Sequence, residues 1–122
     1  MSEDRPWPEE IKVDLSTAML EVRFDNGKSF KLGAEYLRVC SPSAEVRGHG
    51  AGQPKAVGGK RDVKIADMKP IGNYAVRIIF DDGHDTGLYS WDYLYELGRD
   101  REKLWAEYLE RLFSEGGRRD KA

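Results

Sequence analysis

Apolar and polar residues alternate along several short stretches of the chain, which is typical of strands with one buried face. The first two stretches cover residues 11–15 and 19–24. The Asp-Asn-Gly sequence of residues 25–27 follows, and because Asn-Gly tolerates the positive φ angles of a tight turn, a hairpin is predicted here. The alternation continues beyond this turn to Leu32. A short helix is then predicted over residues 34–40.

The same order of patterns returns in the second half of the chain. Strands are predicted from residue 63 to about residue 68 and over residues 74–80. The second of these carries Ile79 on its otherwise polar face, which indicates a strand covered on both faces and central in its sheet. The Asp-Asp-Gly sequence of residues 81–83 predicts a second turn, which leads into a strand over residues 86–89.

Two helices are predicted to complete the chain. The first covers residues 91–97, with Ser90 as its N-cap and Gly98 as its end. The second runs from Asp100 to about Ser114, because large apolar residues recur there at helical spacing opposite a charged face. This aromatic helix is predicted to pack on the core or on a partner.

The two halves of the chain repeat one unit, a strand, a Phe-Asp-(Asn/Asp)-Gly turn, a strand and a helix. The predicted fold class is therefore α+β: a mainly antiparallel sheet of about five to six strands, built from two hairpin-then-helix units, with a C-terminal amphipathic helix. After the turn glycine the first copy has Lys28, whereas the second has His84 followed by Asp85. The aligned residues are Phe24 with Phe80, Leu32 with Leu88 and, after one inserted residue, Tyr36-Leu37 with Tyr93-Leu94.

Residues 41–62, between the two units, contain five glycines and two prolines, which exclude regular structure across most of the segment. The chain of 122 residues is predicted to form a single domain over 1–122, with its core at about residues 10–114 and a flexible tail over residues 115–122. The long loop is basic, which suggests contact with an anionic ligand or an acidic partner, and a merely solvated loop is the alternative. Its candidate contact residues are Arg47, His49, Lys55, Lys60 and Arg61.

Charge and hydropathy exclude several classes of function. The net charge of −2, from 20 Lys and Arg against 22 Asp and Glu, argues against a dedicated nucleic-acid binder. The one basic cluster, Arg118, Arg119 and Lys121, is expected to be a solvated tail. No apolar stretch approaches the roughly 20 residues of a membrane span, and no signal peptide is predicted. The expected location is the cytoplasm.

The sequence contains few residues of the types that act as nucleophiles, acid–base catalysts or metal ligands. Cys40 is the only cysteine, so an intrachain disulfide is excluded, and His49 and His84 are the only histidines. A catalytic Cys-His pair would need a third residue to orient it, and the sequence supplies none. The chain is therefore predicted not to be an enzyme.

Several segments resemble the γ-butyrobetaine hydroxylase-like N-terminal domain family over roughly residues 10–98. They are Asn73-Tyr74-Ala75-Val76, the stretch from Phe80 to Trp91 with its Gly-His-Asp-Thr-Gly sequence, Leu37-Arg38 and Ser41-Pro42-Ser43. This family includes short bacterial proteins of unknown function. It also forms the N-terminal domain of carnitine-synthesis dioxygenases and an appendage of some P-loop ATPases that carry iron–sulfur clusters. The resemblance implies an accessory domain, since the dioxygenase chemistry belongs to a separate domain.

In those dioxygenases the domain resembles a zinc module, with three cysteines and the histidine of the Asp-Gly-His turn as ligands. Here Ser41, Ser43 and Val46 align with the three thiolates, Cys40 lies one residue away, and His84 alone matches. Hydroxyl and aliphatic groups do not replace thiolates toward zinc, so no cofactor is expected. We interpret His84 as a hydrogen-bonding partner of the loop after Cys40. The alternative is a residual zinc or iron site, for which the candidates are His84, Cys40, Asp85 and His49.

Two functions follow as hypotheses. The first is a non-catalytic binding or adaptor domain, linked through its fused relatives to metal or iron–sulfur protein pathways, that contacts a protein partner with its aromatic helix and basic loop. The second is a small metal- or ligand-binding protein that uses Cys40, His49 and His84. Neither the partner nor the oligomeric state follows from the sequence, and the aromatic last helix leaves a dimer open.

Overall fold

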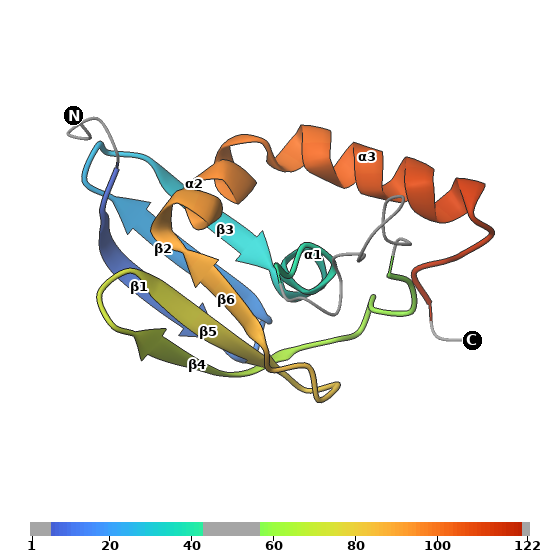
Figure 1. Cartoon of the computed structure of the whole chain (residues 1–122), viewed down its shortest axis with the longest axis horizontal. Helices are drawn as coiled ribbons and strands as arrows, with labels where there is room; N and C mark the ends of the chain where they lie inside the picture. The colour runs from blue at the N-terminus through green and yellow to red at the C-terminus, as the bar shows by residue number, and fades with distance from the viewer. Residues whose placement is uncertain (1–5, 43–56, 121–122) are drawn as a thin grey trace, which may run out of the picture.

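The structure is a computed structural model that describes residues 6–42 and 57–120. Its strands form two three-stranded antiparallel sheets, in the orders β1-β2-β3 and β4-β5-β6, and α3 runs along one side of the molecule (Figure 1). The predicted α+β class is confirmed, and the six strands divide equally between two sheets. The elements are β1 Pro8–Asp14, β2 Met19–Phe24, β3 Ser29–Gly33, α1 Ala34–Val39, β4 Ile65–Ile71, β5 Ala75–Phe80, β6 Gly87–Ser90, α2 Trp91–Arg99 and α3 Arg101–Ser114.

Some predicted boundaries were wrong for identifiable reasons. β4 begins after Val63 and runs through Pro70, which pairs with Val76. β4 is an edge strand of its sheet, and an edge strand tolerates a proline because its outer N–H groups need no partner strand. Gly98 does not end α2, which continues to Arg99. Ser90 does cap α2, because its Oγ accepts a hydrogen bond from the Tyr93 amide at 3.2 Å.

The two Phe-Asp turns have the same geometry. Gly27 and Gly83 have φ angles of +88° and +92°, and each amide donates to the carbonyl of the phenylalanine three residues earlier. The amide of Phe24 donates to the carbonyl of Lys28 at 2.8 Å, and the amide of Phe80 to that of His84 at 2.9 Å. This is the three-residue hairpin loop, in which the glycine alone needs a positive φ. The predicted hairpins are therefore confirmed, but Asn26 does not take the left-handed conformation expected of it.

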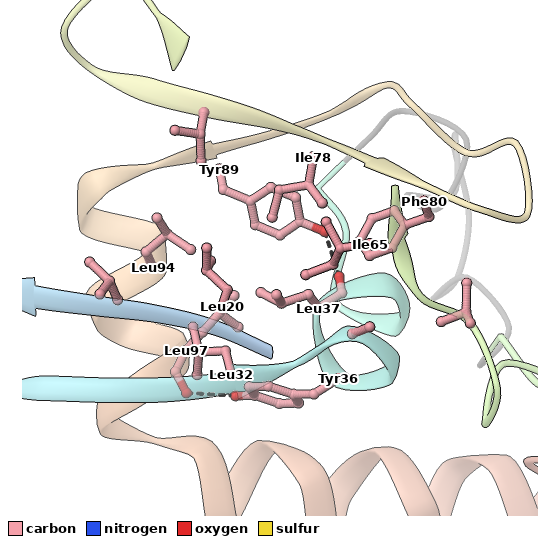
Figure 2. Packing of buried hydrophobic residues seen from close by; sticks show 14 of the residues in the cluster. Leu20, Leu32, Tyr36, Leu37, Ile65, Ile78, Phe80, Tyr89, Leu94 and Leu97 are labelled. Carbon is pink, nitrogen blue, oxygen red and sulfur yellow. Dashed lines mark hydrogen bonds between the residues drawn. The ribbon is translucent and has the colours of Figure 1, made fainter. Parts of the chain in front are cut away.

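Each repeat unit is closed by the helix of the other unit. The Tyr36 hydroxyl of α1 donates to the carbonyl of Leu97 in α2 at 2.7 Å (Figure 2). In return, the Tyr93 hydroxyl of α2 donates to the carbonyl of Cys40, which follows α1, at 2.5 Å. Because these bonds cross between the units in both directions, the two halves form one folded body.

The third residue of each Phe-Asp turn also bonds to the helix of the other repeat unit. The Asn26 side-chain amide donates to the Tyr95 hydroxyl on α2 at 3.1 Å. Arg38 Nε on α1 donates to a carboxylate oxygen of Asp82 at 2.8 Å. Tyr95 and Arg38 each lie two residues after the repeated tyrosine of their helix. The repeat found in the sequence is therefore an approximate two-fold symmetry of the structure.

Strand pairing corrects one residue match within the repeat. Leu32 pairs with Leu20 in the first sheet, and Tyr89 pairs with Val76 at the equivalent place in the second. Tyr89 and Leu32 are both completely buried, whereas Leu88 is 43% exposed. Tyr89 is therefore the structural equivalent of Leu32, and the inserted residue lies directly after the second turn.

The core lies between the two sheets and is closed by α1 and α2. Figure 2 shows side chains of both sheets pointing toward one another, and the Tyr89 hydroxyl bonding to the carbonyl of Leu37 at 2.5 Å. The completely buried leucines of α1 and α2 fill the space between. The largest buried side chains of this core cluster are Leu20, Val22, Phe24, Leu32, Leu37, Ile78, Phe80, Tyr89, Leu94 and Leu97. Among the helices in the described residues, none has the length and apolar content needed to cross a membrane.

The expectation of a solvated basic tail was wrong for Arg119. Its guanidinium makes two hydrogen bonds to the Glu35 carboxylate, at 2.9 and 2.7 Å, and lies 5.2 Å from the centre of the Trp105 ring. The main chain of this segment also accepts hydrogen bonds from Gly59 and Arg61, at 2.9 and 3.0 Å. Residues after α3 therefore tie α1, α3 and the end of the long loop together.

Replacing Arg119 by alanine is expected to lower the free energy of unfolding by about 1–2 kcal/mol, because it removes a bidentate ion pair and a cation–π contact. Urea denaturation followed by tryptophan fluorescence measures the change. Arg118→Ala is the matched control, because Arg118 is exposed and accepts its hydrogen bond from the Gly59 amide through its main-chain carbonyl. This change should alter stability by no more than about 0.5 kcal/mol. Equal losses in both variants would show that the side chain of Arg119 does not hold the tail.

Candidate functional site

His84 and Ser41 form a buried pair beneath the second turn. His84 Nε2 lies 2.8 Å from Ser41 Oγ, and the two residues are 8% and 3% exposed. The His84 ring also lies against Phe80, with 6.1 Å between the ring centres. The predicted hydrogen bond between His84 and the loop after Cys40 is therefore present.

The surroundings of this pair are filled by the chain itself. A Cβ atom on Gly87 would lie 2.5 Å from Ser41 Oγ and 3.1 Å from the Tyr89 ring, so only glycine fits there. Because Tyr93 holds the carbonyl of Cys40, the segment that carries Ser41 is fixed on two sides. The pair is consequently closed off from solvent.

A cluster of charged groups lies at the same turn. Asp82 Oδ2 accepts hydrogen bonds from Arg38 Nε at 2.8 Å and from Lys60 Nζ at 2.6 Å, and Oδ1 accepts from the His84 amide at 3.0 Å. Burial alone would raise the pKa of Asp82, but the bonds from Lys60, His84 and Arg38 together hold it below the ordinary aspartate value. Asp82 is therefore a carboxylate that joins the turn, α1 and the end of the long loop.

Cys40 does not have the properties of a reactive thiol. Burial raises its pKa to about 12, so the thiol stays protonated at neutral pH. Nucleophilic attack and metal binding both require the thiolate. Cys40 acts instead as a partly buried apolar residue beside the core.

The residues present do not fit the zinc site that the family resemblance implies. Ser41 offers a hydroxyl in place of a thiolate, and this hydroxyl is already bonded to Nε2 of His84. Within residues 6–42 and 57–120, no three His, Cys, Asp or Glu side chains are grouped so that they could hold a metal ion. Asp85 is exposed. Ser43, Val46 and His49 lie outside the described residues, so their part in the prediction stays a prediction.

Of the predicted basic loop, the structure describes only the first two residues and the last part, residues 57–62. Lys60 is engaged with Asp82, and Arg61 Nε forms an ion pair with the Asp120 carboxylate at 2.6 Å. Their charges are therefore balanced within the chain. The predicted contacts of Arg47 and Lys55 lie outside the described residues.

The Ser41–His84 distance would suit a nucleophile and its base, but the burial of both residues leaves a substrate no access. A cavity of about 140 Å³ lies beside Lys60 and Asp82. This is below the roughly 300–1,000 Å³ of typical small-molecule sites. A larger open hollow, of about 860 Å³, lies on the outer face of β1-β2-β3 and holds no histidine or cysteine. The arrangement at His84 therefore holds the second turn against the segment after α1.

Sequence reasoning missed the Asp82 cluster. Arg38 and Asp82 are 44 residues apart, and a charged residue in an Asp-Gly turn is usually solvated. The repeat held a usable signal, because Asn26 and Asp82 occupy the same turn position and Tyr95 and Arg38 the same helix position. The contact could have been inferred by assuming that the two units close each other.

Comparison with known proteins agrees with this architecture. The family described as gamma-butyrobetaine hydroxylase-like, N-terminal, matches residues 11–95. The chain belongs to this family. No functionally curated protein matches it.

Solved structures of similar chains extend the comparison beyond the family match. An NMR solution structure of a protein 44% identical covers 97% of this chain and 93% of its own, with a TM-score of 0.83. A second NMR structure, 47% identical, covers 99% of this chain and 90% of its own, with a TM-score of 0.81. A crystal structure from Acidithiobacillus ferrooxidans ATCC 23270, of a protein of unknown function in the DUF971 family, is 35% identical. It covers 80% of this chain and 98% of its own, with a TM-score of 0.66. This member of the family thus resembles other small domains over most of their length.

Proposed function

We propose that this chain is a non-catalytic domain that binds another protein. The observation that carries the proposal is the burial of the Ser41–His84 pair, at 3% and 8% exposure. His84 is the one residue that matches the metal-ligand pattern of the family resemblance, and here it ties the second turn to the end of α1. A histidine used in this way supports a scaffold role rather than a reaction.

Four tyrosines with buried or partly buried side chains support the same function. Four tyrosine hydroxyls donate to main-chain carbonyls, and burial raises the pKa of Tyr108 to about 12, as expected for phenols that stay neutral. Each of these hydroxyl groups joins two segments that are distant from each other in the sequence. The four donors and their acceptors are Tyr36 to Leu97, Tyr89 to Leu37, Tyr93 to Cys40 and Tyr108 to Val57.

Large apolar side chains remain exposed outside this interior. Trp7, Tyr74 and Phe113 are 51%, 56% and 60% exposed. Aromatic residues are enriched at protein interfaces, where they bury large areas at low entropic cost. The family resemblance extends the proposal to a partner in metal or iron–sulfur protein pathways. The proposal takes the cytoplasm as the compartment, because the single cysteine forms no disulfide framework.

The first test is metal content. Protein purified without a chelator or a histidine tag is expected to hold far less than one equivalent of zinc or iron by elemental analysis, in wild type and in His84→Ala alike. The physical reason is that Ser41 supplies no thiolate and already occupies His84 Nε2. One equivalent of metal that disappears in His84→Ala would instead favour the metal-binding hypothesis.

The second part of this test concerns the partner. Chemical crosslinking in the native host, followed by mass spectrometry, is expected to recover one protein in stoichiometric amount with the wild-type chain. The Ser41→Ala variant should recover the same protein, because the pair is structural. A chain lacking residues 47–61 shows whether the basic loop contributes to the contact. Recovery of no stoichiometric protein would count against the proposed function.

A further inference from the structure

The outer faces of the two sheets carry different charge patterns. In the first sheet, the middle row across the strands is Lys12, Glu21 and Lys31, which are direct cross-strand neighbours. Opposite charges thus stand side by side, which stabilises a sheet surface. Each lysine of this row therefore has a carboxylate as its cross-strand neighbour.

The equivalent row of the second sheet is Lys69, Arg77 and Leu88. Arg77 stands where the first sheet has Glu21, so two cations lie directly opposite each other, a destabilising arrangement. Among the described residues neither Lys69 nor Arg77 has an ion pair. Arg77 Nε is buried and has no hydrogen-bond acceptor. A buried donor without an acceptor costs free energy. The carboxylate on this face, Asp67, lies opposite Ile79 rather than Arg77, and its Oδ1 accepts a hydrogen bond from the Met68 amide at 2.8 Å.

Apolar groups flank the two cations. Leu88 is 43% exposed beside Arg77, and Ile79 follows Arg77 on the same face of β5. β4 and β5 lie on the side of the molecule away from α3, so that helix does not cover this face (Figure 1). The surface therefore offers positive charge next to apolar area.

We propose that the outer face of β4-β5-β6 binds an acidic segment of a partner protein, in which a carboxylate stands beside apolar side chains. This inference rests on the proposed function and names the surface and the chemistry of the partner. The carboxylate pairs with the guanidinium of Arg77 and the ammonium of Lys69, and its apolar neighbours cover Leu88 and Ile79. The bound carboxylate supplies the negative charge that Glu21 supplies on the first sheet.

A second copy of this chain fits the surface less well. A two-fold dimer through this face would place Arg77 and Lys69 against the same two cations of the other copy. The exposed glutamates of α3, Glu107 and Glu110, would instead make a head-to-tail contact, which leaves open chains rather than a closed dimer. An acidic segment of a different protein avoids both difficulties.

Titration of isotope-labelled protein with a synthetic peptide tests the proposal by NMR. The probe is a nine-residue peptide of alternating leucine and glutamate, and the matched peptide has glutamine at every glutamate position. Amide shifts are expected to concentrate in β4, β5 and β6. The glutamine peptide is expected to bind at least about tenfold more weakly, since the charge-assisted bonds to Arg77 and Lys69 are lost.

Charge variants decide whether Arg77 makes this contact. Arg77→Glu and Lys69→Glu are each expected to weaken binding of the acidic peptide at least about tenfold. A peptide of alternating lysine and leucine should instead bind Arg77→Glu more tightly than it binds the wild type. Arg23→Glu, an equal charge change on the outer face of the first sheet, is the control and should leave binding unchanged. Thermal unfolding shows that each variant is folded, and Arg77→Met, which removes the buried donor, should be folded and fail to bind. Equal weakening by Arg23→Glu, or shifts outside β4–β6, would overturn the proposal.

Further outcomes separate this inference from the proposed function. If a single-stranded DNA oligomer binds as tightly as the acidic peptide, the surface binds anions without specificity. If the wild type dimerises and Arg77→Glu abolishes the dimer, a second copy of the chain is the occupant. Both results would overturn the proposal. If the crosslinked host protein binds wild type and Arg77→Glu equally, the proposed function stands and this surface is wrong. If crosslinking recovers no protein, the proposed function itself fails.

Discussion

Replacing Asp82 by alanine is expected to lower the free energy of unfolding by about 3 kcal/mol, because it leaves a largely buried cation without its acceptor. The side chains of Arg38 and Asp82 are only 11% and 19% exposed. A second donor atom of Arg38, Nη1, is already buried without a partner, so the guanidinium has no alternative acceptor nearby. Lys60 would lose its 2.6 Å contact as well, which frees the end of the long loop.

Urea denaturation of Asp82→Ala measures this loss. Asp85→Ala is the matched control, because Asp85 is an exposed carboxylate three residues later and should change stability by less than about 0.5 kcal/mol. The double variant Arg38→Met, Asp82→Ala is expected to regain part of the loss, because a buried ion pair replaced by apolar groups leaves no unpaired charge. If the two single changes simply add, Arg38 and Asp82 do not act as a pair.

The contribution of Asp82 also has a definite pH dependence. Its folded pKa lies below the ordinary value of 3.8, so the unfolded chain takes up the proton first as the pH falls. The stabilisation is therefore complete above pH values near the ordinary pKa and is lost as the pH falls below it. The difference in stability between wild type and Asp82→Ala should be constant from about pH 7 to pH 5 and shrink below about pH 4. A difference that grows on acidification would contradict this assignment.

Local patterns predicted the elements well because each depends on neighbours in the sequence. The alternation of 19–24 and the helical spacing of 100–114 gave β2 and α3 within a residue. The turns were found because glycine at a left-handed position is a strong local signal. Boundaries failed where tertiary contacts decide them. Gly98 reads as a stop signal, yet it lies within α2 because the Phe30 ring packs against it.

The way the two halves close each other could not be read from alternation. Alternation shows which face of a strand is buried, but it does not identify the element that covers that face. The bond from Tyr36 to Leu97 joins residues 61 positions apart. For the same reason Leu88 was matched with Leu32, although strand pairing makes Tyr89 the buried residue.

The candidate site was predicted in part. The bond between His84 and the segment after Cys40 followed from the family resemblance, and the structure contains it as Ser41–His84. The Asp82 cluster did not follow, because the sequence cannot show that a charged turn will be covered by Arg38. The unpaired state of Arg77 likewise appears only after cross-strand neighbours are known.

Replacing Gly98 by alanine is expected to lower the free energy of unfolding by about 2 kcal/mol, although alanine is the better helix former. A Cβ atom at this position would lie 2.2 Å from Phe30 Cγ and 2.4 Å from Cδ2. Helix propensity alone would favour alanine by about 1 kcal/mol, so the sign of the change reports the clash. The Phe30 ring has little room to retreat, since it also packs edge-on against Phe24 and Tyr95 at 6.1 and 5.5 Å.

The repeat explains why a glycine is required there. Phe30 pairs with Val22, and at the equivalent place Gly87 pairs with Ile78. In the first unit a large strand residue therefore faces a glycine of the opposite helix. In the second unit the strand residue is the glycine, and Ser41 fills the space. In each unit the strand residue and the residue that packs against it are therefore one large and one small, in opposite order. The size of one side chain at this contact thus limits the size of the other.

A double-mutant cycle between Phe30 and Gly98 tests this dependence. Phe30→Ala removes the ring and should be destabilising by itself, through the loss of its contacts with Phe24 and Tyr95. In that background Gly98→Ala is expected to be neutral or stabilising by up to about 1 kcal/mol, because the clash is gone and only helix propensity remains. Urea denaturation of the four proteins gives the coupling energy. If Gly98→Ala costs the same with and without the Phe30 ring, the ring does not decide the residue at position 98.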